Sequence, residues 1–106
     1  MPNYLIRLAT TAEYVDGVLQ EGFAVREAYV KELIEGLGGS LRSMYWAHGP
    51  DDAFVLAWAP EVEVINAALL AANRAGQVST STVALFTSEE MDEAARKLPE
   101  YRPPGG

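Results

Sequence analysis

The chain has 106 residues, which is enough for one compact domain and too few for two of ordinary size. Hydrophobic residues make up 49% of it and charged residues 22%, so the chain as a whole is not intrinsically disordered. The 15 acidic residues outnumber 8 basic ones and give a formal net charge of −7, which argues against binding to nucleic-acid phosphates.

The chain contains no cysteine, which excludes disulfides, thiolate metal sites and a cysteine nucleophile. The segment Met1-Pro2-Asn3-Tyr4 has no basic region followed by an apolar stretch, so no secretory signal is predicted. No apolar run approaches the roughly 20 residues of a membrane-spanning helix. We therefore expect a cytoplasmic protein with no membrane partner and no nucleic-acid partner.

The first part of the chain predicts a strand followed by helical segments. Residues Asn3–Ala9 are β-favouring, with apolar side chains on both faces. A capping box follows, in which Thr10 is the expected N-cap and Glu13 reaches back to it. A short helical segment comes next, and helical spacing resumes at Phe23. The apolar face of this longer helix, which Gly38-Gly39 ends, contains Phe23, Val30, Leu33, Ile34 and Leu37.

A hairpin is predicted in the middle of the chain. Residues Ser40–Ala47 and the wholly apolar Ala53–Ala59 are the expected strands. The turn formers His48-Gly49-Pro50-Asp51-Asp52 join them. Gly49 is expected to adopt a conformation that a β-carbon would penalise, and Asp52 to accept hydrogen bonds from nearby backbone amides.

The last part predicts a helix, a strand, a second helix and a tail. The first helix starts at Pro60 and ends at Gly76, and a strand covers Val78–Phe86. Thr87-Ser88-Glu89-Glu90 is a capping box that opens the last helix, which Pro99 ends. The side chains expected to face the core are Val62, Ile65, Leu69 and Ala72 in the first of these helices, and Met91, Ala94, Ala95 and Leu98 in the second.

This order predicts an α+β fold, a ferredoxin-like βαββαβ sandwich with an extra C-terminal helix and an antiparallel sheet in the order 4-1-3-2. Residues 1–98 form the single domain, and 99–106 are a Pro/Gly-rich C-terminal tail. Two helices cover only one face of such a sheet. Because the strands carry apolar side chains on both faces, we expect a homodimer in which two sheets pack face to face as a dimeric α+β barrel.

Four residues are candidates for ligand binding: Arg26, Tyr45, His48 and Asp52. His48 and Asp52 share one turn, where they fit either an acid–base pair or a solvated turn. A metal site is not predicted, because ligands from one short turn do not surround an ion. Arg26 fits a surface position, or pairing with Asp52 or with a ligand carboxylate. Tyr45 and its aromatic neighbours fit either an apolar ligand cavity or plain core and interface.

Several further segments resemble one known family over nearly the whole chain: Thr11–Gly17, Arg26, Gly38-Gly39, Tyr45–Gly49, Asp52, Pro60, Gly76–Thr82, Thr87–Glu90 and Tyr101–Gly105. They resemble the GYD-domain proteins, which are small stand-alone domains of largely unknown function. The family's Gly-x-Tyr-Asp motif stands here as Gly49-Pro50-Asp51-Asp52, so Asp51 takes the place of the tyrosine. The resemblance implies a ferredoxin-like dimeric barrel and no settled substrate.

Two functions from different classes are therefore open. One is a homodimeric domain that binds a small apolar or aromatic metabolite, including a cofactor-free enzyme of the dimeric-barrel type. The other is a non-enzymatic module for assembly or partner binding. Neither requires a cofactor, and fold alone does not choose between them.

Overall fold

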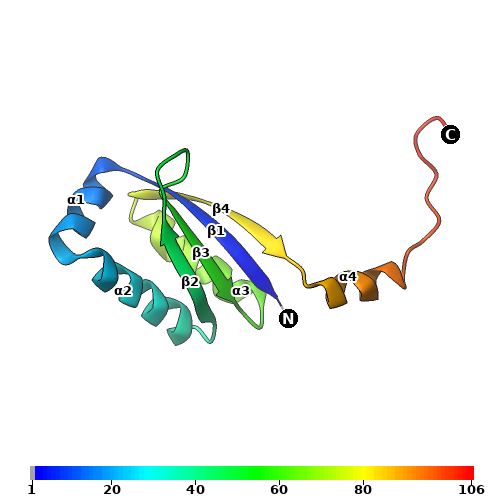
Figure 1. The fold of residues 1–106 in the computed structure, drawn as a ribbon, viewed down its shortest axis with the longest axis horizontal. Helices are drawn as coiled ribbons and strands as arrows, with labels where there is room; N and C mark the ends of the chain where they lie inside the picture. The colour runs from blue at the N-terminus through cyan, green and yellow to red at the C-terminus, as the bar shows by residue number, and fades with distance from the viewer. Residues whose placement is uncertain (1) are drawn as a thin grey trace.

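The computed structural model describes residues 2–106, which form an α+β fold with one four-stranded antiparallel sheet and four helices (Figure 1). In chain order the elements are β1 (Asn3–Thr10), α1 (Ala12–Glu21), α2 (Phe23–Gly36), β2 (Ser40–Trp46), β3 (Ala53–Trp58), α3 (Val62–Arg74), β4 (Val78–Leu85) and α4 (Ser88–Ala95). The sheet order is β2-β3-β1-β4, which confirms the predicted 4-1-3-2 order. The arrangement is roughly ferredoxin-like.

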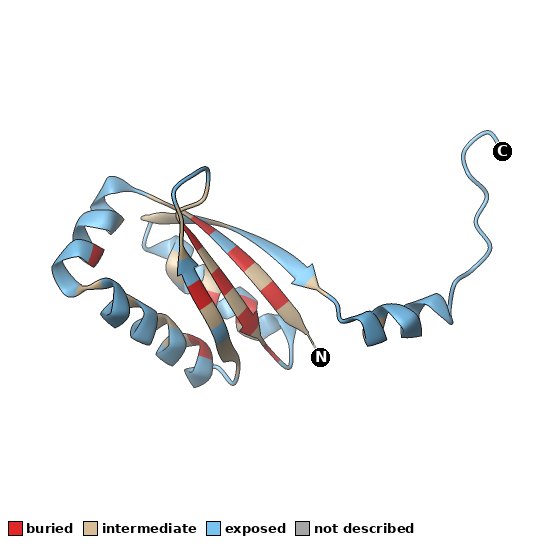
Figure 2. Ribbon diagram, in the orientation of Figure 1, coloured by how far each residue is buried: buried red, intermediate tan, exposed pale blue. Residues whose placement is uncertain are grey.

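One face of the sheet packs against helices α2 and α3, and it holds the core. Alternate residues of β1 and β3 point to this face, and the register pairs Ile6 with Val55 and Tyr4 with Ala57. Ile34 from α2 and Ile65 from α3 complete the layer. The red bands that alternate along these strands in Figure 2 mark these buried positions. Val62, predicted to be buried, is instead 45% exposed in the first turn of α3, and Ala68 takes its place in the core.

The opposite face of the sheet has no helix over it. We call it the open face. Its principal side chains are Leu5, Arg7, Tyr45, Phe54, Leu56, Trp58, Ser81 and Val83. In this face Leu5 and Leu56 are paired and only partly buried, while Tyr45 is 68% exposed. Arg7 donates a hydrogen bond to the Ser81 hydroxyl across the β1–β4 pair, at 3.1 Å.

The connection between α2 and β2 requires glycine at two adjacent positions, as predicted. Gly38 has a positive φ of 94°. A β-carbon on Gly39 would lie 2.9 Å from the Ile34 side chain and 2.9 Å from the Trp58 carbonyl oxygen. The expectation for Gly49 was wrong, because its φ is not positive and a β-carbon there would meet nothing within 4 Å.

The predicted capping box at the start of α1 was also wrong in its residues. Thr11, not Thr10, is the N-cap, and its hydroxyl accepts a hydrogen bond from the Tyr14 amide. Glu13 does not reach back to the N-cap; its carboxylate accepts a hydrogen bond from the Gln77 side chain at 2.9 Å. The helix therefore begins one residue later than predicted, and β1 extends through Thr10.

The C-terminal arm, which we define as residues 86–106, lies away from the rest of the fold (Figure 1). The predicted capping box of α4 is confirmed, since Thr87 and Glu90 exchange both hydrogen bonds. The predicted inward packing of α4 is wrong, because none of its residues is buried. Met91 is 56% exposed and Leu98 80% exposed.

Asp52 ties the β2–β3 hairpin to the end of β1. Its amide donates to the Leu8 carbonyl at 2.7 Å, which extends the β1–β3 ladder by one bond. One rung further, its carboxylate oxygen Oδ2 accepts hydrogen bonds from the Thr10 amide at 2.7 Å and the Thr10 hydroxyl at 3.1 Å. It serves the neighbouring strand rather than the amides of its own turn.

Replacing Asp52 with alanine is expected to lower the free energy of unfolding by about 1–3 kcal/mol, because the part-buried Thr10 amide loses its acceptor. Asp51→Ala is the matched control, since no hydrogen bond of the Asp51 side chain is found in residues 2–106, and we expect little change. Urea denaturation of both variants measures the difference. Equal losses in the two would remove the structural role assigned to Asp52.

Candidate functional site

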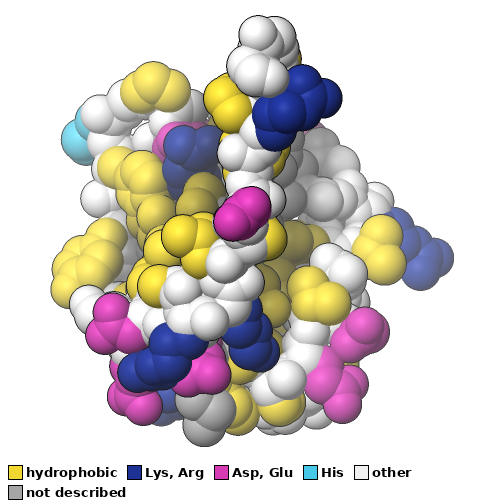
Figure 3. Space-filling model, turned by 90° about the vertical axis from the view of Figure 1, so that its right-hand side faces the viewer, with side chains coloured by type: hydrophobic (Ala, Val, Ile, Leu, Met, Phe, Trp, Pro, Cys, Tyr) yellow, Lys and Arg dark blue, Asp and Glu magenta, His cyan; other side chains and the backbone are white. Residues whose placement is uncertain are grey.

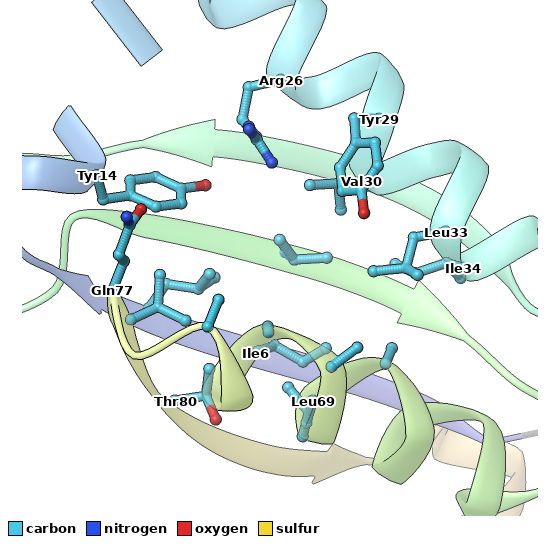
Figure 4. A pocket seen from close by; sticks show the side chains of 17 residues that line it. Ile6, Tyr14, Arg26, Tyr29, Val30, Leu33, Ile34, Leu69, Gln77 and Thr80 are labelled. Atoms are coloured by element: carbon cyan, nitrogen blue, oxygen red, sulfur yellow. The ribbon is translucent and has the colours of Figure 1, made fainter. Parts of the chain in front are cut away.

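A pocket of about 290 Å³ lies between α2, α3 and the helix-covered face of the sheet (Figure 4). Its walls are mostly apolar and come from the core strands and the facing sides of the two helices. Its polar groups are Tyr14, Arg26, Tyr29, Gln77 and Thr80. The pocket therefore has the composition typical of small-molecule sites, with a few polar groups above an apolar floor.

Arg26 is the charged residue of this pocket, and the helical repeat of α2 places it there. Tyr29 and Val30 follow it at i+3 and i+4, and all three line the pocket. The Arg26 guanidinium lies 5.7 Å from the ring centroid of Tyr14 and 5.0 Å from that of Tyr29. Such cation–π contacts hold an arginine in one orientation. Its side chain is 27% exposed, so its charge is partly shielded from water.

The ion pair of Arg26 uses only one edge of the guanidinium. Its Nε donates to Glu21 Oε1 at 2.5 Å, and Glu21 does not line the pocket. Within residues 2–106 the two terminal NH₂ groups of Arg26 make no hydrogen bond. Figure 4 shows the guanidinium pointing from α2 into the pocket, between Tyr14 and Tyr29. Two parallel N–H donors are thus directed at the space a ligand would occupy.

The remaining polar groups at the pocket are held by hydrogen bonds from α1 and α3. Gln77 donates to Glu13 through its side chain, and its carbonyl accepts from the Thr11 amide at 3.0 Å. Thr80 accepts from the Asn73 amide group at 3.2 Å. These contacts from α1 and α3 fix the positions of Gln77 and Thr80 at the pocket.

The pKa of the Tyr14 phenol is raised above its ordinary value of 10.0, chiefly because burial disfavours the phenolate. The Arg26 charge lowers this pKa, and the Glu21 charge raises it. Tyr14 is consequently a neutral hydrogen-bond donor throughout the physiological pH range.

A second hollow of about 490 Å³ lies between α1, the start of α2 and the end of β2. Phe23 and Trp46 meet there edge to face, with ring centroids 4.9 Å apart. Asp52 and His48 also line it. The Asp52 carboxylate is engaged by Thr10, and His48 is exposed. The Asp52 carboxylate is therefore less available to a ligand than the directed guanidinium of Arg26.

The structure does not bring the four candidate residues into one site. Arg26 lines the pocket between α2 and α3, whereas His48 and Asp52 line the second hollow. Tyr45 lies on the open face. Arg26 pairs with Glu21 and not with Asp52.

Tyr14 and Tyr29, which the sequence-based prediction did not include, accompany Arg26. The i, i+3 spacing of Arg26 and Tyr29 was the local signal for one of these contacts. Tyr14 comes from α1, and no local pattern links it to Arg26.

Among residues 2–106, no group of three or more histidine, cysteine, aspartate or glutamate side chains is placed to hold a metal ion. A search of the same residues for a helix long and apolar enough to cross a membrane finds none.

The fold and the pocket define an α+β domain with a ligand-sized site on the helix-covered side of its sheet. The family model of the GYD domain matches residues 4–95, which is most of the chain, and the protein belongs to this family. The match confirms the resemblance seen in the sequence. No curated protein matches the chain.

Because the pKa of Tyr14 is raised, its phenol should ionise at high pH, and a single substitution should remove this ionisation. In a spectrophotometric titration, Tyr14 should ionise above its ordinary pKa of 10.0, and Tyr14→Phe should remove that high-pH contribution. Because the folded-state pKa is raised, this group's contribution to stability is present below pH 10 and is lost as the pH rises through the folded-state value. Tyr101, which is 78% exposed, is the control, and Tyr101→Phe should leave the high-pH component intact. A Tyr14→Phe titration identical to that of the parent at high pH would contradict the assignment.

Proposed function

We propose that this protein is a homodimeric small-molecule-binding domain, and that its ligand is an apolar or aromatic carboxylate bound in the pocket of Arg26. The observation that supports the ligand class is the guanidinium itself. It is oriented by two tyrosine rings, and its terminal NH₂ groups are directed into an apolar cavity.

A planar carboxylate matches this donor pair, because the two terminal NH₂ groups of an arginine bind two carboxylate oxygens in parallel. The ligand's apolar body would lie on Val30, Leu69 and Val78 deeper in the pocket. Glu21 remains on Nε, at the other edge of the guanidinium. The ligand would therefore bind without displacing the ion pair that holds Arg26 in place.

A binding role is favoured over catalysis by the groups that line the pocket. Among the described residues that line it, none is histidine, aspartate or glutamate, the usual general bases. Tyr14, Gln77 and Thr80 are hydrogen-bond donors and acceptors that select and orient a ligand.

The homodimer is supported by the open face. Leu5, Phe54, Leu56 and Trp58 form a contiguous apolar surface that lies across the sheet from the helices. A surface of this kind in a monomer is unfavourable, and a second copy with the same face is a self-complementary cover. Two sheets packed in this way would make a dimeric α+β barrel, with the pockets of Arg26 outside the barrel on each helix layer.

The ligand proposal is tested with phenylacetate and its uncharged analogue phenylacetamide, added to isotope-labelled protein and followed by amide chemical shifts. Phenylacetate should shift amides of the pocket, and phenylacetamide should bind at least tenfold more weakly because it lacks the charged partner of Arg26. Arg26→Gln should remove most of this difference.

Lys31→Gln is the matched control, since it removes one positive charge from the same helix at a position that does not line the pocket. It should leave the preference for phenylacetate unchanged. Equal binding of the two compounds, or equal effects of the two substitutions, would overturn the role of Arg26.

A further inference from the structure

We infer that the ring of Tyr14 separates the pocket of Arg26 from the second hollow, and that it restricts the ligand to a carboxylate with a single apolar substituent. The inference rests on the proposed binding of a carboxylate at Arg26 and adds to it the residue that selects among such ligands. A carboxylate with two aryl groups on one carbon would need the space on both sides of this ring.

Tyr14 is the residue that the two hollows have in common. It lines both, and among residues 2–106 no other residue does. Figure 4 shows its ring at the α1 end of the pocket of Arg26, with the hydroxyl directed toward the space beneath the guanidinium. The ring therefore stands at the boundary between the two spaces.

The two hollows follow one another along the same strand and the same helix. On β1, Leu8 lines the pocket of Arg26 and Thr10 lines the second hollow. These residues are two apart, so both point to the helix-covered face. On α2, Phe23 lines the second hollow and precedes Arg26 by three residues. Since β1 and α2 run past both spaces, the ring of Tyr14 from α1 is what divides them.

Hydrogen bonds fix the first turn of α1, which carries Tyr14. The Tyr14 amide donates to the Thr11 hydroxyl at 3.2 Å, and the Thr11 amide donates to the Gln77 carbonyl at 3.0 Å. The Gln77 side chain also donates to the Glu13 carboxylate. The ring itself lies 5.7 Å from the Arg26 guanidinium. Contacts to the start of β4 and to α2 thus hold the ring between the two hollows.

The second hollow has the size and composition to take an aryl group. Val15, Val18, Phe23 and Trp46 give it apolar sides. An apolar cavity of about 150 Å³ accommodates benzene. By this measure the second hollow, of about 490 Å³, has room for a ring. The pocket of Arg26, of about 290 Å³, holds one aryl group with its carboxylate but not two.

The position of Arg26 explains why a second substituent would meet Tyr14. The carboxylate end of the ligand lies beside the Tyr14 ring, because the guanidinium that binds it lies against that ring. The first substituent extends away over Val30 and Leu69. Substituents on one tetrahedral carbon diverge, so a second one would be directed toward the ring. Tyr14 therefore selects against a second substituent on that carbon.

The test compares phenylacetate with diphenylacetate on the full-length protein, followed by amide chemical shifts. The parent should bind phenylacetate at least tenfold more tightly. Tyr14→Ala should abolish or reverse this preference, because the second ring is then buried in the second hollow. Tyr14→Leu keeps an apolar side chain of smaller size and should move the preference in the same direction. The result therefore does not depend on one variant alone.

Tyr29→Ala is the matched control. It removes the other ring beside Arg26, 5.0 Å from the guanidinium, at a residue that does not line the second hollow. Tyr29 is 52% exposed, so the space left by its ring opens to water. This variant should weaken the binding of both compounds and leave their ratio unchanged. Equal changes of the ratio in Tyr14→Ala and Tyr29→Ala would overturn the role of Tyr14.

The amide signals also locate the second ring. In Tyr14→Ala, diphenylacetate should shift the amides of Val18 and Trp46, and phenylacetate should not. Exposed apolar side chains take up aryl compounds weakly, and Figure 3, which looks along the C-terminal arm toward the body, shows hydrophobic side chains gathered beside the arm. Shifts by diphenylacetate that are confined to the exposed Met91 and Leu98 would show such uptake and overturn the inference.

The outcomes separate this inference from the proposed function. A parent that binds phenylacetate, with a preference unaffected by Tyr14→Ala and Tyr14→Leu, would overturn the role of Tyr14 and leave the role of Arg26 standing. A parent that binds neither compound would overturn both.

Discussion

The structure depends on one constraint: its central strands are apolar on both faces, while the chain supplies helices for only one. β1 pairs with β3 and β4, so every side chain of β1 is committed to one of two layers. Ile6 and Val55 face the helices and are buried. Leu5 and Leu56, one residue along, face the other way. The remaining features of the molecule follow from how each face is covered.

On the helix-covered face, the side chains of α2, α3 and the sheet do not fill all the space between them, and the unfilled space is the pocket. Helices α2 and α3 both line this pocket, and Gln77 and Thr80 lie at its edge after α3. Arg26 lies there because α2 presents Arg26, Tyr29 and Val30 on one side. The two tyrosine rings and Glu21 fix the guanidinium. The same contacts that stabilise the helix layer therefore orient the group that we propose binds the ligand.

The sequence predicted what local patterns encode. The wholly apolar run Ala53–Ala59 and the turn formers before it indicated the hairpin, and the order of elements indicated the sheet order, which the structure confirms. Contacts between residues far apart in the sequence could not be predicted from these local patterns. The partner of Asp52 is Thr10, 42 residues earlier, and the contact of Tyr14 with Arg26 joins two helices. The spacing of Thr10 and Glu13 indicated a cap at Thr10, but Glu13 accepts a hydrogen bond from Gln77, 64 residues later, and Thr11 caps the helix. The amphipathic pattern of α4 indicated an apolar side that would pack inward, but such a pattern does not specify a packing partner, and no residue of α4 is buried.

The central claim is that a second copy covers the open face. Its most direct measurement is the mass of the full-length protein by sedimentation equilibrium at micromolar concentration, repeated for Leu56→Lys, which places a charge in the middle of that face. The account predicts twice the 11.5 kDa of one chain for the parent protein and a shift to the monomer for Leu56→Lys. A parent protein that sediments at 11.5 kDa throughout, or a dimer that Leu56→Lys leaves intact, would contradict it.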